Sequence, residues 1–333
     1  MEQKRVLSAI QPTGEMHLGN YFGAIQRWVE LQEEHECFYG IVNYHAMTMP
    51  YKPKKLQEST WNMVLDLLAA GIEANNVFIQ SLVPEHTELN WILHCFCSYG
   101  ELGRMTQFKD KSQQANTKDT YVSAGLFSYP VLQAADILMY KADFVPVGRD
   151  QDQHLELTRN IAQRFNHQVG KEYFQLPEVM YSQTPKLLST ADPSRKMSKS
   201  AGPKHFIPLF SSKEQIQRQI RSAVTDTGNT PAGEMSEGVK NLFQLLKACG
   251  AHEASDSLMA DYDSQSLKYV DLKSEVTDAL ITFNQPMVER RQELQARRKE
   301  VKDQIKASSA EIRKVAQTTL KEVKQLTGLI NPR

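Results

Sequence analysis

The chain has 333 residues, of which 41% are hydrophobic and 23% charged, so it is long and apolar enough for two globular domains with a substantial core. Its formal net charge is +0, and the overall charge therefore gives no support for a nucleic-acid partner. Mean hydropathy is −0.48, and no apolar run approaches the roughly 20 residues of a membrane-spanning helix, which excludes an integral membrane protein.

The first 80 residues predict strands that alternate with helices. The first apolar stretch, residues 5–10, is too short for a signal peptide, so we expect a cytoplasmic protein and interpret this stretch as a strand. Residues 38–42 and 77–80 are two further strand candidates. Helical spacing of apolar residues occupies 18–34 and the region around 61–68. This alternation predicts an α/β fold with a parallel sheet.

The middle of the chain continues the pattern and then becomes polar. An apolar segment at 129–140 and a second one at 153–165 have helical spacing, and residues 144–147 between them read as extended. The stretch 182–204 is rich in polar residues, with proline and serine, and is predicted to be a loop.

Beyond the loop the pattern is almost purely helical. The predicted helices cover residues 213–224, 239–248 and 270–329. We therefore expect a Rossmann-like catalytic domain over residues 1–205 and an all-helical domain over residues 206–333. The four cysteines form no Cys-x-x-Cys pair, so free thiols are expected rather than a metal site or disulfides.

The string His17-Leu-Gly-Asn20 stands where the first strand gives way to the first helix. A helix start after a tight turn offers free N–H groups and a positive dipole end to a phosphate. Gly14 and Gly19 leave room for a nucleotide beside the backbone, and His17 can donate to phosphate oxygens. By itself this motif is weak evidence for a phosphate site, because a capped helix with a surface histidine can have the same sequence.

The string Lys-Met-Ser-Lys-Ser at residues 196–200 lies inside the polar loop. Two lysines on a mobile turn can reach a polyphosphate and stabilise the charge that develops on a leaving pyrophosphate. A solvated surface loop is the alternative, although this five-residue string is rare by chance.

The two strings together, in this order and flanking an α/β segment, resemble the class I aminoacyl-tRNA synthetases. The resemblance covers essentially the whole chain and is greatest to the tryptophan-specific branch of bacterial and organellar type, where Asn commonly replaces the last histidine of the first motif. It is carried by the strings at residues 10–14, 19–24, 44–48, 100–111, 134–138, 145–148, 153–157 and 222–226. It implies a tryptophan–tRNA ligase that uses ATP with Mg²⁺ bound through the phosphates.

The resemblance also implies an amino-acid pocket. The indole N–H is the only polar handle of the tryptophan side chain, so a selective pocket needs apolar walls and one fixed acceptor. Asp136 corresponds to that acceptor, while Tyr129 and Gln151 correspond to residues that hold the ammonium group. The other pocket residues implied are Leu7, His45, Gln133, Val145 and Val147. By sequence alone each of them has an ordinary packing or surface role as its alternative.

For ATP, the resemblance implies a set of binding residues and a catalytic subset. The catalytic subset is His17, Asn20, Lys111, Lys196 and Lys199, with no metal held by the protein itself. The remaining ATP-binding residues are Gln11, Gly19, Gly148, Asp150, Gln151 and Met197. The chain departs from the common family pattern at Ala9, Asn43, Gln133 and Arg149, which leaves affinity and inhibitor response open.

Family members are homodimers that charge tRNA, so a homodimer and tRNA(Trp) are the expected partners, with no membrane or DNA. The helical domain is expected to read the anticodon. Basic residues that could meet RNA phosphates, or simply face solvent, are Lys299, Lys302, Lys306, Arg313 and Lys314. Three other functions stay open: a tyrosyl-tRNA synthetase, a nucleotidylyltransferase, and a tryptophan-sensing paralogue that charges no tRNA.

Overall fold

The protein is described by a computed structural model. It describes residues 3–110, 121–181, 187–226, 230–231 and 234–331. Five parallel strands form one sheet in the order β3-β2-β1-β4-β5, which confirms the predicted Rossmann-like α/β fold. The strands are β1 (Arg5–Ile10), β2 (Glu36–Ile41), β3 (Val77–Ile79), β4 (Phe144–Val147) and β5 (Glu178–Tyr181).

Side chains of the central strands alternate between two apolar cores, as the two-residue period of a strand requires. Val6 and Ile41 belong to one core, whereas Leu7 and Phe38 belong to the other. β5 was not predicted. It is a half-exposed edge strand whose apolar residues are too few to stand out in the sequence.

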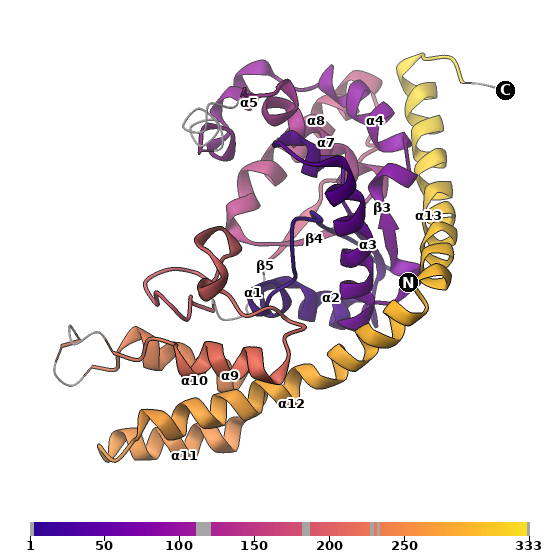
Figure 1. Ribbon diagram of the computed structural model, residues 1–333. Helices are drawn as coiled ribbons and strands as arrows, with labels where there is room; N and C mark the ends of the chain where they lie inside the picture. Colours follow the sequence, from indigo (N-terminus) through magenta and orange to yellow (C-terminus); the bar gives the residue numbers. More distant parts are fainter. Residues whose placement is uncertain (1–2, 111–120, 182–186, 227–229, 232–233, 332–333) are drawn as a thin grey trace.

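Helices cover both faces of the sheet (Figure 1). They are α1 (Leu18–Asn20), α2 (Gln26–Leu31), α3 (Pro53–Ala69), α4 (Glu85–His94), α5 (Tyr99–Arg104), α7 (Ala124–Met139) and α8 (Asp152–Val169). The predicted helix 18–34 is interrupted by a π-helical segment, Tyr21–Ile25, between α1 and α2. α7 begins earlier than predicted, because the Ser123 side chain accepts a hydrogen bond from the Leu126 amide and caps the helix.

The C-terminal part is helical, as predicted, in the order α9 (Lys213–Arg221), α10 (Glu237–Ala248), α11 (His252–Asp263), α12 (Tyr269–Ala296) and α13 (Arg298–Thr327). The region 270–329, predicted to be helical, consists of two helices that meet at Arg297. α12 packs on α3, α9 and α10, while α13 returns along the sheet part and packs on β3 and α4 (Figure 1). None of the described helices is long and apolar enough to cross a membrane.

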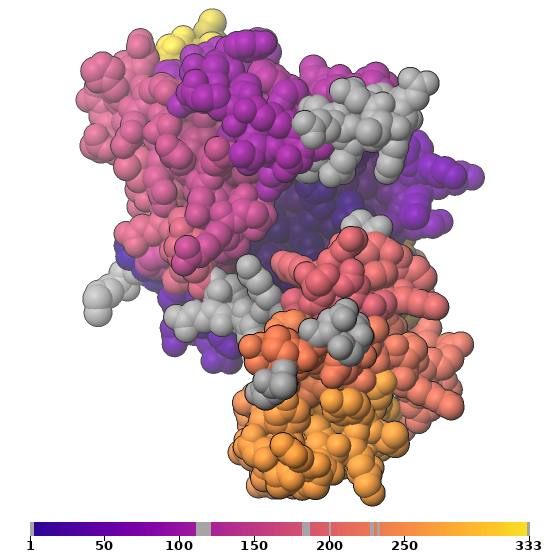
Figure 2. Space-filling model, turned by 90° about the vertical axis from the view of Figure 1, so that its left-hand side faces the viewer, coloured from indigo at the N-terminus to yellow at the C-terminus, as the bar shows by residue number. Residues whose placement is uncertain are grey.

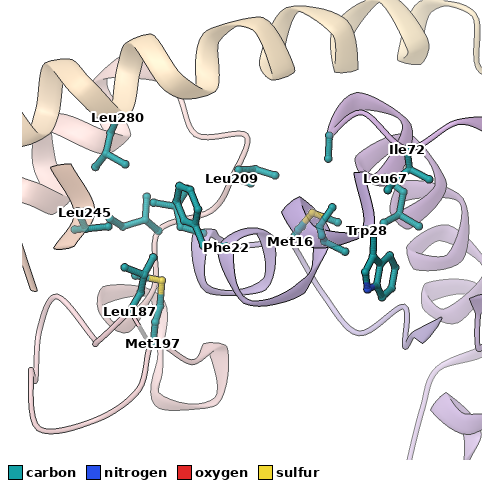
Figure 3. Packing of buried hydrophobic residues seen from close by; sticks show 14 of the residues in the cluster. Met16, Phe22, Trp28, Leu67, Ile72, Leu187, Met197, Leu209, Leu245 and Leu280 are labelled. Carbon is teal, nitrogen blue, oxygen red and sulfur yellow. The ribbon is translucent and has the colours of Figure 1, made fainter. Parts of the chain in front are cut away.

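The first core continues from the sheet into the helical part. Figure 3 shows Phe22 close to Leu187 and Met197 of the loop and to Leu245 and Leu280 of the C-terminal helices, while Trp28 lies near Leu67. Polar contacts also tie α13 to the sheet: the Ser308 hydroxyl donates to the Val77 carbonyl at 2.8 Å. The division at residue 205 stays a prediction, and the packing of α13 adds that chain beyond it is part of the shell around the sheet.

Candidate active site

A cavity of about 330 Å³ opens at the carboxyl ends of β1 and β4. The chain leaves these neighbouring strands toward opposite sides of the sheet, so this is the topological switch point at which open α/β folds bind ligands. Figure 2 shows a hollow in this face of the molecule with the indigo N-terminal residues at its floor. The predicted residues in its wall are Leu7, Gln11, His45, Tyr129, Gln133, Asp136, Val145, Val147, Gly148, Asp150 and Gln151.

Asp136, on α7, is a buried carboxylate in the wall of this cavity, with 3% of its surface exposed. The Nε2 atom of His45 lies 2.7 Å from Oδ2, and Nδ1 of His86 lies 2.7 Å from Oδ1. The Gln80 amide donates to both oxygens, at 2.8 and 3.0 Å. Burial alone raises the pKa of Asp136, but His45 and His86 outweigh it and lower the value to about 2, so the carboxylate is ionised at neutral pH.

The sequence interpretation missed two members of this network. Gln80 follows β3 directly, and its position at the carboxyl edge of the sheet was the available signal. His86 is fully buried on α4, and its second ring nitrogen lies 2.7 Å from the Tyr140 hydroxyl. No local sequence pattern distinguishes His86 from an ordinary core histidine, since its partners are 50 and 54 residues away.

Several polar side chains in or behind the wall of the cavity are hydrogen-bonded to one another. The Tyr129 hydroxyl lies 2.8 Å from Nε2 of His154 and donates to Oε1 of Gln107 at 3.2 Å. Burial raises the pKa of Tyr129 to about 12, which keeps the hydroxyl protonated. The Gln133 amide donates to Gln151 at 3.2 Å, so the departure at Gln133 places a donor inside the pocket.

His17 lies at the start of α1, buried to 5% exposure. Burial, followed by the charges of Lys199 and Lys196, lowers the pKa of His17 to about 4, so the ring is neutral at physiological pH. Its buried Nδ1 atom has no hydrogen-bond partner within the described ranges, so the hydrogen-bonding capacity of this atom is unmet. The Asn20 side chain accepts a hydrogen bond from the His17 amide at 3.2 Å and stabilises this turn.

The lysine loop lies on the glycine turn that precedes His17. Nζ of Lys199 donates to the carbonyl oxygens of Thr13, at 2.5 Å, and Glu15, at 2.9 Å. Gly14, between them, has a φ of +75°, a conformation that glycine adopts without strain. Burial lowers the pKa of the Lys199 ammonium. Two motifs almost 180 residues apart in the chain therefore meet at one turn.

The remaining residues of the loop differ in exposure. Met197 is buried beside Gly19, where an added Cβ would lie 3.5 Å from the Met197 Cβ. Lys196 is exposed near the same turn. Lys111 lies outside the described residues. The described ranges contain no cluster of three or more metal-ligating His, Cys, Asp or Glu side chains.

Residues 1–285 match the family described as tRNA synthetases class I (W and Y). The chain belongs to this family. The tryptophan–tRNA ligase of Clostridium acetobutylicum is 42% identical over 99% of both chains, and that of Helicobacter pylori strain J99 is 43% identical over 99% of this chain and all of its own.

The structures agree with the sequences. The tryptophanyl-tRNA synthetase of Campylobacter jejuni, solved as a complex with ADP and tryptophan, is 35% identical and superposes with a TM-score of 0.85. The alignment covers 98% of this chain and 100% of that one. The likeness thus extends through the sheet and the C-terminal helices.

Proposed function

This chain is a tryptophan–tRNA ligase, and we propose that the cavity between β1 and β4 binds tryptophan while the His17 turn and the lysine loop bind ATP. The contact of Lys199 with the carbonyls of Thr13 and Glu15 carries this proposal, because it brings the two phosphate-binding motifs to one place. The alternatives are a tyrosyl-tRNA synthetase, a nucleotidylyltransferase and a tryptophan sensor that charges no tRNA. Each of them explains fewer of these contacts.

In the first step the tryptophan carboxylate attacks the α-phosphorus of ATP. The new oxygen–phosphorus bond replaces the bond to pyrophosphate, and a carboxylate needs no general base at neutral pH. Lys196 and Lys199 stabilise the charge on the departing pyrophosphate, and neutral His17 donates a hydrogen bond from its ring. Mg²⁺ bound to the ATP phosphates would offset part of their charge.

In the second step a ribose hydroxyl of the terminal adenosine attacks the tryptophanyl carbonyl carbon. An ester bond forms, the bond from this carbon to the adenylate oxygen breaks, and the hydroxyl proton leaves with AMP. By likeness to class I enzymes we assign the 2′-hydroxyl as the nucleophile.

Asp136 supplies the amino-acid specificity. Its ionised carboxylate is held by His45, His86 and Gln80, so it is a fixed acceptor for the indole N–H. A competitor without this donor would leave the buried carboxylate with one hydrogen bond fewer. The free-energy cost of that unpaired acceptor disfavours binding of the competitor. Tyr129 and Gln151 lie at the mouth of the same cavity, where they can receive the ammonium group.

A direct test is pyrophosphate exchange by the purified chain with tryptophan, tyrosine and phenylalanine in turn, followed by aminoacylation of a tRNA pool. Exchange with tryptophan alone and charging of tRNA(Trp) alone are the expected results. Faster exchange with tyrosine would contradict the pocket assignment, and exchange without charging would contradict the ligase assignment.

We also propose that the chain acts as a cytoplasmic homodimer. Trp91 on α4 and Tyr99 on α5 are exposed to 72% and 80%, which is unusual for large aromatic side chains. A second copy of the chain would bury these rings. Sedimentation analysis should find a dimer for the native chain and a shift toward monomer for Trp91→Glu; a dimer of unchanged affinity would exclude this surface.

The helices α9 to α12 remain the proposed anticodon-reading part. The basic residues considered on α13 are a weaker choice, since most are engaged within the chain. Arg313 pairs with Glu85 at 2.8 Å, and Lys302 lies 5.2 Å from the centre of the Trp61 ring. Lys306 and Lys314 pair with acidic residues one turn away.

A further inference from the structure

A second hollow, of about 580 Å³, borders the glycine turn and is unused by the steps above. Its walls are the turn itself, through Thr13 and Gly14, and the segment that joins β2 to α3. We call it the α3 groove. It is lined, among others, by Met49, Tyr51, Lys52 and Lys55.

The α3 groove shares a wall with the ATP site. Thr13 and Gly14 line the groove, and the carbonyl of Thr13 is an acceptor for Lys199. His45 begins the segment that forms the other wall and is also part of the tryptophan cavity. A group held in the groove would therefore border both the activated carboxyl group and the phosphates.

The charge of the groove is not explained by the stability of the helix beside it. Lys52, Lys54 and Lys55 all lie exposed at the start of α3, and the first turn of this helix contains no acidic residue. Cations are unfavourable at a helix N-terminus, where the dipole end is already positive, and three neighbouring lysines repel one another. Such a concentration of positive charge favours a polyanion as the ligand.

Tyr51 adds an aromatic surface. Its ring is 43% exposed at the groove, although large aromatic side chains are usually more buried. An exposed aromatic ring beside lysines is a combination that binds single-stranded nucleic acid. The bases stack on the ring, and the backbone phosphates lie next to the lysines. Pyrophosphate or ATP alone would use the lysines but would have no need of the tyrosine.

We propose that the α3 groove binds the single-stranded 3′ end of the tRNA, with a base stacked on Tyr51 and the backbone phosphates beside Lys52 and Lys55. This places the terminal ribose at the shared wall, from which it reaches the acyl carbon. The inference rests on the ligase activity, and the pyrophosphate exchange reaction, which needs no tRNA, tests that activity separately.

The main experiment compares exchange with aminoacylation in Tyr51→Ala. Loss of one stacked base should lower kcat/KM for tRNA on the order of tenfold, while tryptophan-dependent exchange keeps the native rate and Tyr51→Phe charges tRNA normally. An equal fall in exchange would assign the groove to ATP or pyrophosphate and overturn the proposal, as would native charging by Tyr51→Ala.

The lysines offer a matched control, because Lys54 is exposed on the same turn but does not line the groove. The double variant Lys52→Ala, Lys55→Ala should weaken tRNA binding more than Lys54→Ala does, with a reduced dependence on salt. If the double variant and Lys54→Ala weakened tRNA binding equally, the lysines would act only through their general positive charge, and a specific binding site in the groove would be contradicted.

Shortened tRNA locates the contact. Removing the unpaired 3′-terminal nucleotides should abolish the difference in binding between the native chain and Tyr51→Ala. A difference that persists with the shortened tRNA would show that the groove contacts another part of the molecule, and the proposal would be wrong.

Discussion

The cavity proposed to bind tryptophan and the lysine loop are held in place by different means. Asp136 lies in the last turn of a 16-residue helix, α7, and is surrounded by donors from three other segments of the chain. Lys199 lies in a 3-10 turn of a polar loop, and its ammonium group rests on two backbone carbonyls. In the proposed mechanism, recognition therefore depends on a side chain fixed by burial and hydrogen bonds, whereas Lys199 must exchange its partners when ATP binds.

This difference has a physical logic. A buried acceptor discriminates between ligands only if its side chain cannot rotate to accommodate the wrong one. Its hydrogen bonds to the protein must therefore be formed before the ligand binds. A cation that binds pyrophosphate equally well before and during the reaction would lower the ground state as much as the transition state. Lys199 already donates to two carbonyl oxygens, and pyrophosphate would have to replace these hydrogen bonds.

The largest effect is expected at the loop. Lys199→Ala should lower kcat for tryptophan-dependent exchange by roughly 10² to 10³, the cost of removing one group that stabilises developing charge. KM for tryptophan should change little, because Lys199 is absent from the wall of the tryptophan cavity. Lys204→Ala, an exposed lysine of the same segment, is the control. A change confined to KM would contradict the catalytic role.

Asp136→Ala tests the cavity proposed to bind tryptophan rather than the lysine loop. Loss of a charged acceptor costs about 1.5–3 kcal/mol, so kcat/KM for tryptophan should fall by roughly ten- to a hundredfold. The preference for tryptophan over phenylalanine should fall with it. Exchange assays with both amino acids give the ratio, and circular dichroism checks that the variant is folded. A ratio equal to the native one would rule out the indole contact.

His86 should act only through Asp136. His86→Leu removes one donor, and we expect about a tenfold rise in KM for tryptophan with KM for ATP unchanged. Tyr140→Phe, one contact farther away, should give a smaller change in the same direction. A merely structural role would alter both KM values or neither, and His86→Gln should recover part of the loss by restoring a donor.

The smallest effect concerns pH. The pKa of His17 is about 4 in the folded chain against an ordinary 6.5, so the unfolded chain binds this proton first as pH falls. The stability contributed by neutral His17 is therefore complete above pH 6.5 and is lost as pH falls toward 4. Urea unfolding at pH 7 and pH 5 should show a smaller loss for His17→Asn than for the native chain. His252→Asn, at an exposed position, should behave as the native chain does.

Local patterns in the sequence determined much of this protein. Apolar periodicity located four of the five strands and the long helices, because a strand and a helix each bury one face and repeat at fixed intervals. The two motifs proposed to bind phosphate could also be recognised in the sequence, because each is a contiguous string of residues. Residues of the tryptophan cavity were named through family likeness and do line one cavity.

Only the tertiary structure decided the rest, because it depends on side chains distant in the chain. In the sequence Asp136 cannot be distinguished from any other carboxylate on a helix. Its partners His45, His86 and Gln80 come from three other segments and meet it only in the folded chain. The return of α13 to β3, the break at Arg297 and the edge strand β5 likewise follow from packing between elements. Periodicity records which face of an element is buried, whereas the choice of partner for that face is made only when the whole chain folds.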